Sequence, residues 1–161
     1  MKSLVLYSSQ TGNTQQLAKA IASALPNPTL LPIDEAVPYA DYDIVALGYW
    51  VLRGMPDTKV LDYIKDLRGA KVILFGTLGA YVHSEHAQKC IRQSEALVAE
   101  HNTVLGSFLC MGKVDSFYAA KSRHPMTPER QARLEEAAKH PNQEDFEKAR
   151  SFILNLLARL P

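Results

Sequence analysis

The sequence predicts an α/β fold in which helices cover both faces of a doubly wound sheet of five parallel strands, giving three layers. Short apolar runs alternate along the chain with segments of helical periodicity, which is the pattern of successive strand–helix–strand units. The first run, Leu4–Tyr7, has no strongly polar residue, as expected of a strand buried on both faces. The length of 161 residues fits one domain, and we expect residues 1–161 to form it.

The expected elements follow one another in a regular order. Apolar runs predict strands at Leu4–Tyr7, Thr29–Ile33, Ile44–Leu47, Val72–Phe75 and Val104–Met111. Apolar residues at helical spacing predict helices over residues 13–25, 57–67, 84–100 and 143–159, with a further capped start at Thr127. The strand order 2-1-3-4-5 would leave a crevice where the loops after strands 1 and 3 diverge. Function is therefore expected in residues 8–14, 48–57 and 76–83.

Composition narrows the possible functions. The formal charge of +1, with both halves near neutral, gives no basic face for nucleic acid. The apolar stretches are too short to cross a bilayer or to form a signal peptide, so a cytoplasmic protein without membrane insertion is expected. Cys90 and Cys110 share no spacing motif and are expected to be buried, reduced thiols. His83, His86 and Cys90 share a helix face but have no evident fourth ligand, so no metal is expected.

Small polar residues fill the connection between the first strand and the first helix. They are Ser9, Gln10, Thr11, Gly12, Asn13 and Thr14. The first N–H groups of a helix lack intrahelical partners, and together with hydroxyl donors they favour an anion. The connection has no lysine for a triphosphate and only one glycine, too few for a dinucleotide fingerprint. It therefore suits one terminal phosphate, and a polar helix cap is the alternative.

The run Ser9-x-Thr11-Gly12-Asn13-Thr14, directly after a strand that ends in Tyr7, resembles the phosphate-binding signature of the flavodoxins. The order of elements and the length of the whole chain are also similar to that family. In flavodoxins this loop holds the 5′-phosphate of FMN. The resemblance therefore implies a flavodoxin-like sheet with FMN as cofactor.

The resemblance also implies that the second and third loops enclose the flavin ring. Trp50, the only tryptophan, would stack on one face, with Tyr49 as a second candidate; the alternative is an aromatic residue that closes the core. In the third loop Gly76 and Gly79 would admit the edge of the ring, and Tyr81 would cover the opposite face. Further cofactor contacts are expected from Val51, Leu52, Arg53, Gly54, Thr77 and Leu78.

Two features of the second loop depart from the family pattern. Many flavodoxins are strongly acidic, whereas this chain is near neutral and carries Arg53, a cation that would favour the anionic reduced flavin and raise its potential. Many flavodoxins also have a glycine after the tryptophan that lets a peptide flip toward the flavin. Here β-branched Val51 resists positive φ and the glycine is delayed to Gly54, so weaker accumulation of one-electron-reduced flavin is expected.

The resemblance implies an electron carrier that takes electrons from a reductase or ferredoxin and passes them to a partner enzyme, as a monomer or weak dimer. No side chain need then act as acid or base. One alternative is an FMN-dependent reductase or dehydrogenase of the quinone or protoporphyrinogen type. Another is a dedicated accessory flavoprotein of one reductase, such as a tetrapyrrole reductase. A signalling module without flavin is a further alternative, but a response regulator would have acidic residues where this chain has Ser8 and Ser9.

Overall fold

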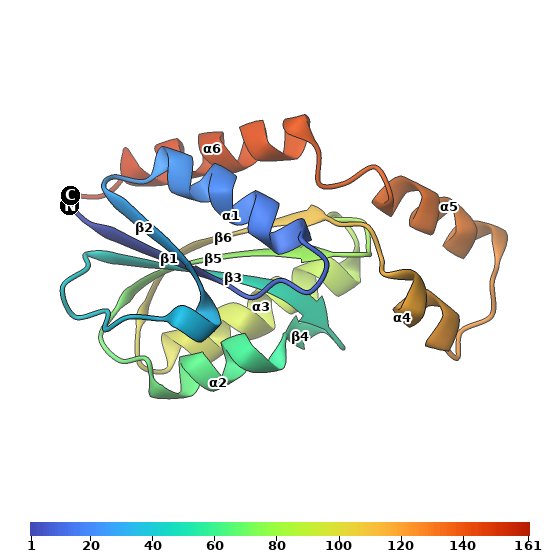
Figure 1. Ribbon diagram of the computed structural model, residues 1–161, viewed down its shortest axis with the longest axis horizontal. Coiled ribbons are helices and arrows are strands. Elements are labelled where there is room, and N and C mark those ends of the chain that lie inside the picture. The colour runs from blue at the N-terminus through green and yellow to red at the C-terminus, as the bar shows by residue number, and fades with distance from the viewer.

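The computed structural model describes residues 1–161, and a parallel sheet lies at its centre (Figure 1). The strands are β1 (Ser3–Tyr7), β2 (Pro28–Pro32), β3 (Ile44–Leu52), β5 (Lys71–Leu78) and β6 (Thr103–Met111). They pair in the order β2-β1-β3-β5-β6, and every pair in this row is parallel. The predicted fold class and strand order are confirmed.

Helices cover both faces of the sheet (Figure 1). On one face lie α1 (Asn13–Ala24) and α6 (Gln143–Leu157), and on the other lie α2 (Thr58–Asp66) and α3 (Glu85–Ala99). Alternate residues of a strand point to opposite faces. Leu4 and Leu6 therefore pack in the core beneath α2 and α3, whereas Val5 packs in the core beneath α1 and α6.

Strand β3 is longer than the sequence predicted. It continues to Leu52 and returns through a two-residue turn to the short antiparallel strand β4 (Met55–Pro56). Arg53 and Gly54 form the turn with φ of 52° and 80°, and positive φ at both positions is the mark of a type I′ hairpin. Strand β5 likewise continues to Leu78, since its residues keep pairing with both neighbours. Much of the two predicted flavin loops is therefore strand.

The segment between β6 and α6 extends beyond the end of the sheet (Figure 1). It contains α4 (Ser116–Lys121) and α5 (Pro128–Ala137). Thr127 caps α5 as predicted, because its Oγ1 accepts a hydrogen bond from the Arg130 N–H at 3.1 Å. The sequence did not predict α4, which has no buried residue. None of the helices combines the length and apolar character that crossing a bilayer needs.

Candidate functional site

A cavity lies at the carboxyl ends of the central strands, where the strand order predicted a crevice. Counted together with its open side, it spans about 680 Å³. Its walls come from four segments: Ser9, Gln10, Thr11, Asn13 and Thr14; Trp50, Val51 and Leu52; Thr77, Leu78 and Gly79; and Gly112, Lys113, Val114, Asp115 and Tyr118. Three of these segments are those that the sequence singled out, and the fourth, after β6, is new.

The first segment leaves donors free at the start of α1. Gly12 is the residue before the helix and has φ of 96°, which only glycine adopts readily. Its N–H donates to Ser9 Oγ at 3.1 Å, which closes a tight turn. No side chain caps α1, so the polar residues of this segment do not serve as a helix cap. The N–H groups of the first helical turn are therefore available to a ligand at the wall of the cavity.

Two side chains of this segment are already engaged within the protein. Thr14 is buried, and its Oγ1 lies 2.9 Å from Thr77 Oγ1 and 3.4 Å from the carbonyl oxygen of Tyr49. Asn13 Nδ2 donates to the carbonyl oxygen of Lys113 at 2.9 Å. These bonds fix the segment to β3, β5 and the end of β6. They leave Ser9, Thr11 and the backbone as the donors that face the cavity.

A cation also borders the cavity. Lys113 lies two residues beyond the end of β6 and lines the same cavity as Ser9 and Thr11. It is exposed and makes no ion pair. The sequence did not predict it, because the cations considered there were those of the first loop and Arg53 of the second. The signal that could have found it is its position just after the fifth parallel strand, at the same sheet edge.

Asp57 holds the backbone of Trp50 in place. The Trp50 N–H donates to Asp57 Oδ2 at 3.2 Å, and the Asp57 N–H donates to the Trp50 carbonyl at 3.0 Å. Asp57 is only 2% exposed. Burial raises the pKa of its carboxyl group, and hydrogen bonds from Ser8 and nearby backbone N–H groups oppose this shift. The sequence analysis did not assign a role to Asp57.

Tyr118 forms the wall opposite Trp50. The two ring centroids are 6.1 Å apart and the ring planes are inclined by 48°. The Tyr118 hydroxyl donates to Gln10 Oε1 at 3.2 Å, so this side chain reaches from α4 to the first segment. No signal in the sequence pointed to Tyr118, because α4 is short and none of its residues is buried.

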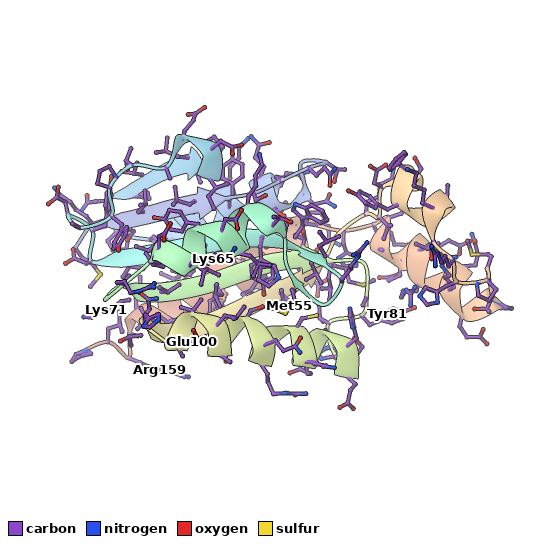
Figure 2. All side chains as sticks on the ribbon, turned by 90° about the horizontal axis from the view of Figure 1, so that it is seen from below. Met55, Lys65, Lys71, Tyr81, Glu100 and Arg159 are labelled. Atoms are coloured by element: carbon purple, nitrogen blue, oxygen red, sulfur yellow. The ribbon has the colours of Figure 1, made fainter.

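Several residues predicted to contact the cofactor do not line the cavity. The Tyr49 side chain is buried in the core, where loss of solvation raises its pKa to about 12. A Cβ at Gly76 would lie 2.8 Å from this ring, so Gly76 makes room for Tyr49 rather than for a ligand. Arg53 and Gly54 form the tip of the hairpin. Tyr81 is 44% exposed and lies toward the base of the projecting segment (Figure 2).

The cavity therefore offers different chemistry at its two ends. Hydroxyl groups, free N–H groups and Lys113 can hold an anionic group, whereas Trp50, Tyr118, Val51 and Leu52 can contact a flat apolar ring. No group of His, Cys, Asp or Glu side chains is arranged to hold a metal ion. An elongated ligand with an anionic end and an aromatic end, such as FMN, fits this arrangement.

Comparison with known proteins places this chain in a family. A family model for the flavodoxin domain matches residues 4–154. The flavodoxin-like domain-containing protein BilS of Clostridioides difficile (strain CD3) is 32% identical over 172 residues, which cover 99% of this chain and 98% of that protein. The BilS protein of Clostridium symbiosum (strain WAL-14163) is 27% identical over 132 residues, which cover 71% of this chain and 70% of that protein.

Solved structures share the fold. Flavodoxin 1 of Bacillus cereus has a TM-score of 0.65 at 18% identity and matches over 100% of both chains. A flavoprotein of Lactobacillus acidophilus, solved in complex with FMN, has a TM-score of 0.54 at 20% identity, covering 67% of this chain and 92% of that one. At these identities the likeness shows the fold alone. The family model, which matches nearly the whole chain, and the 32% identity to BilS show that the chain belongs to the flavodoxin family.

Proposed function

We propose that this protein binds FMN in the cavity and carries electrons between a donor and an acceptor protein. The observation that carries the proposal is the first segment of the cavity wall, where α1 begins with no side-chain cap beside the hydroxyls of Ser9 and Thr11. A phosphate monoester would receive hydrogen bonds there from groups that have no other strong acceptor. The match to a flavodoxin domain, together with the family's use of FMN, supports the choice of ligand.

The side chains would share the work of binding. Ser9, Thr11 and the first N–H groups of α1 hold the phosphate, and Lys113 adds a favourable charge. Trp50 contacts one face of the ring, Tyr118 covers the other face after moving away from Trp50, and Leu52 and Val51 shield the ring from water. The bound flavin supplies the electron transfer, while the protein sets its position and surroundings.

A carrier fits the cavity better than an enzyme with its own substrate. The titratable side chains of the wall are Lys113, Asp115 and Tyr118. Asp115 Oδ1 accepts a hydrogen bond from the Phe117 N–H, and the Tyr118 hydroxyl is bonded to Gln10. The wall thus contains no imidazole, and one oxygen of its single carboxylate caps α4, which leaves few groups to move a proton to or from a bound substrate.

The test compares FMN with riboflavin, which lacks the phosphate. Each is titrated into the purified protein while flavin fluorescence and the emission of the single tryptophan, Trp50, are followed. We expect FMN to bind about ten- to a hundredfold more tightly, because charge-assisted hydrogen bonds contribute about 1.5–3 kcal/mol. Equal affinity would contradict phosphate binding by the first segment. Anaerobic assays with NAD(P)H and quinones then separate the roles: sustained turnover would indicate an enzyme rather than a carrier.

A further inference from the structure

The projecting segment, residues 116–133, forms an arm at the cavity end of the molecule (Figure 1). The arm consists of α4, the connection to α5 and the first turns of α5. Its Tyr118 lines the cofactor cavity next to Trp50, so the arm lies beside the place where electrons would enter or leave. A protein that covers the arm would approach the cofactor site.

The arm carries uncompensated positive charge. It contains Lys121, Arg123, Arg130 and Arg133 against one carboxylate, Glu129, whereas the rest of the chain has 14 Lys and Arg against 16 Asp and Glu. None of the four cations has a carboxylate within ion-pair distance. Arg130 is held in place by the carbonyl oxygens of His124 and Ala119, at 2.8 and 3.2 Å. The arm is thus the positive end of an otherwise slightly negative molecule.

Apolar side chains are exposed on the same arm. Seven large apolar residues of the chain are exposed; Phe117, Tyr118 and Met126 lie on the arm, with exposed fractions of 56, 39 and 56%, and Tyr81 lies at its base. Between Tyr81 and the arm runs a groove whose lining includes His86, His124, Arg130 and Arg133. Aromatic residues, methionine and arginine are the types enriched in protein interfaces. The arm therefore has the composition of a docking surface.

We propose that the arm docks the acidic face of a protein redox partner. The proposal rests on the proposed function, because it concerns the protein that exchanges single electrons with the bound cofactor. A carboxylate-rich face would be steered to the arm and would pair with Arg123 and Arg133, whose side chains have no partner within the protein. A second copy of this chain is disfavoured, because two like-charged arms repel. A membrane surface is disfavoured because α4 is only six residues long and offers no extended apolar face.

The test uses an acidic ferredoxin as the probe and a matched pair of charge reversals. Arg123→Glu/Arg133→Glu changes two side chains of the arm that form no hydrogen bond to other side chains or backbone and do not line the cavity. Lys71→Glu/Arg159→Glu makes the same change in net charge at the opposite end of the molecule (Figure 2). FMN binding of each variant is measured first. Binding of oxidised ferredoxin to 15N-labelled protein is then followed by NMR at low and high salt, with or without FMN.

We expect ferredoxin to shift the resonances of residues 116–133, with shifts that fade at high salt. The Arg123→Glu/Arg133→Glu variant should lose them, and its FMN should be reduced by reduced ferredoxin about tenfold more slowly at low salt, whereas the control should behave like wild type. Absent shifts, shifts elsewhere, or equal effects of the two variants would overturn the proposal. So would binding of the arm to anionic lipid vesicles or a dimer formed through the arm. If the protein did not bind FMN, the proposed function would be rejected. The docking proposal would still be tested, because the NMR titration does not require FMN.

Discussion

The ring of Tyr118 lies against the ring of Trp50 across the mouth of the cavity, with centroids 6.1 Å apart. Two rings in contact leave no room for a third between them, so a flat ligand that enters must displace one of them. Trp50 is part of β3 and is fixed by Asp57, whereas Tyr118 belongs to a helix with no buried residue. Tyr118 is therefore the wall that we expect to move.

The first prediction concerns this wall. Tyr118→Ala should weaken FMN binding by up to about tenfold, because an aromatic stack contributes roughly 0.5–1.5 kcal/mol beyond buried area. Tyr118→Phe should retain most of the affinity. Without FMN, Tyr118→Ala should also shift the emission of Trp50 to longer wavelength, since the indole gains contact with water. Met126→Ala, an exposed apolar residue outside the cavity wall, is the control. Unchanged affinity and emission in Tyr118→Ala would contradict its role.

The second prediction separates two cations. Lys113 lines the cavity, whereas Arg53 lies at the tip of the hairpin. Lys113→Gln should weaken FMN binding by roughly two- to fivefold at low salt, the size of an exposed charge interaction, and the difference should shrink at high salt. Arg53→Gln should have a smaller effect on affinity and on the flavin potentials. FMN titrations at two ionic strengths measure the affinity, and a redox titration measures the flavin potentials. A larger effect of Arg53→Gln than of Lys113→Gln would support the role that the sequence suggested for Arg53.

The sheet and the first segment of the site could be predicted because their signals are local. An apolar run such as Leu4–Tyr7 defines a buried strand, and the small polar residues after it define the start of a helix at the sheet edge. The extent of β3 beyond Gly48 could not be predicted in this way. It depends on pairing with β5, where Trp50 lies opposite Thr77, and such pairing is not visible within one strand.

The rest of the site could not be predicted because it depends on contacts between distant segments. Tyr118 reaches the cavity only because the chain after β6 turns back toward Gln10. Tyr81 and Tyr118 are both tyrosines near the ends of strands, and nothing in their local sequence shows which one lines the cavity. Tyr49 and Trp50 are adjacent, and the alternation of a strand sends one ring into the core and the other to the cavity.

The third prediction concerns the buried carboxylate that fixes Trp50. Asp57→Asn keeps an oxygen that can accept the Trp50 N–H and removes a charge that burial disfavours, but its amide cannot accept all the hydrogen bonds that the carboxylate receives. The free energy of unfolding at pH 7 should therefore fall less than in Asp57→Ala. Asp57→Ala leaves the Trp50 N–H without its partner and should lower the free energy of unfolding by about 1–3 kcal/mol. Urea unfolding of both variants measures the difference. Equal destabilisation by the two substitutions would show that the charge itself is needed.

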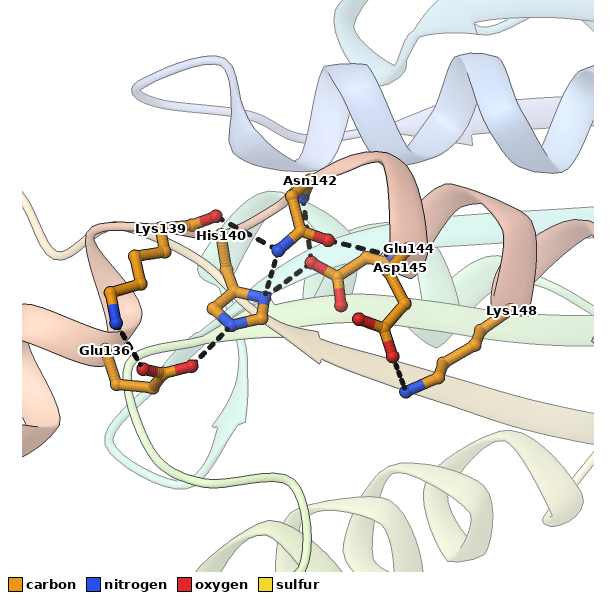
Figure 3. Close-up of polar contacts among 7 residues, drawn as sticks. All are labelled: Glu136, Lys139, His140, Asn142, Glu144, Asp145 and Lys148. Atoms are coloured by element: carbon orange, nitrogen blue, oxygen red, sulfur yellow. Dashed lines mark hydrogen bonds and ion pairs between the residues drawn. The ribbon is translucent and has the colours of Figure 1, made fainter.

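The fourth prediction concerns His140, which joins the ends of α5 and α6 (Figure 3). Its Nδ1 lies 2.6 Å from Asp145 Oδ2 and its Nε2 lies 3.2 Å from Glu136 Oε1. Burial lowers the pKa of the imidazole, but the hydrogen bonds to Asp145 and Glu136 outweigh it, so the pKa is raised above its ordinary value. Because both ring nitrogens face carboxylates, the charged ring can donate to both.

A raised pKa in the folded state means that protonated His140 stabilises the fold. This stabilisation should be complete below the unfolded value, about pH 6.5, and should be lost as the pH rises through the higher folded value. The difference in free energy of unfolding between wild type and His140→Gln should therefore shrink between pH 6 and alkaline pH in urea titrations. His101→Gln, which changes an exposed histidine whose side chain forms no hydrogen bond, is the control. A difference between wild type and His140→Gln that stays constant with pH would show that His140 acts through packing and not through its charge.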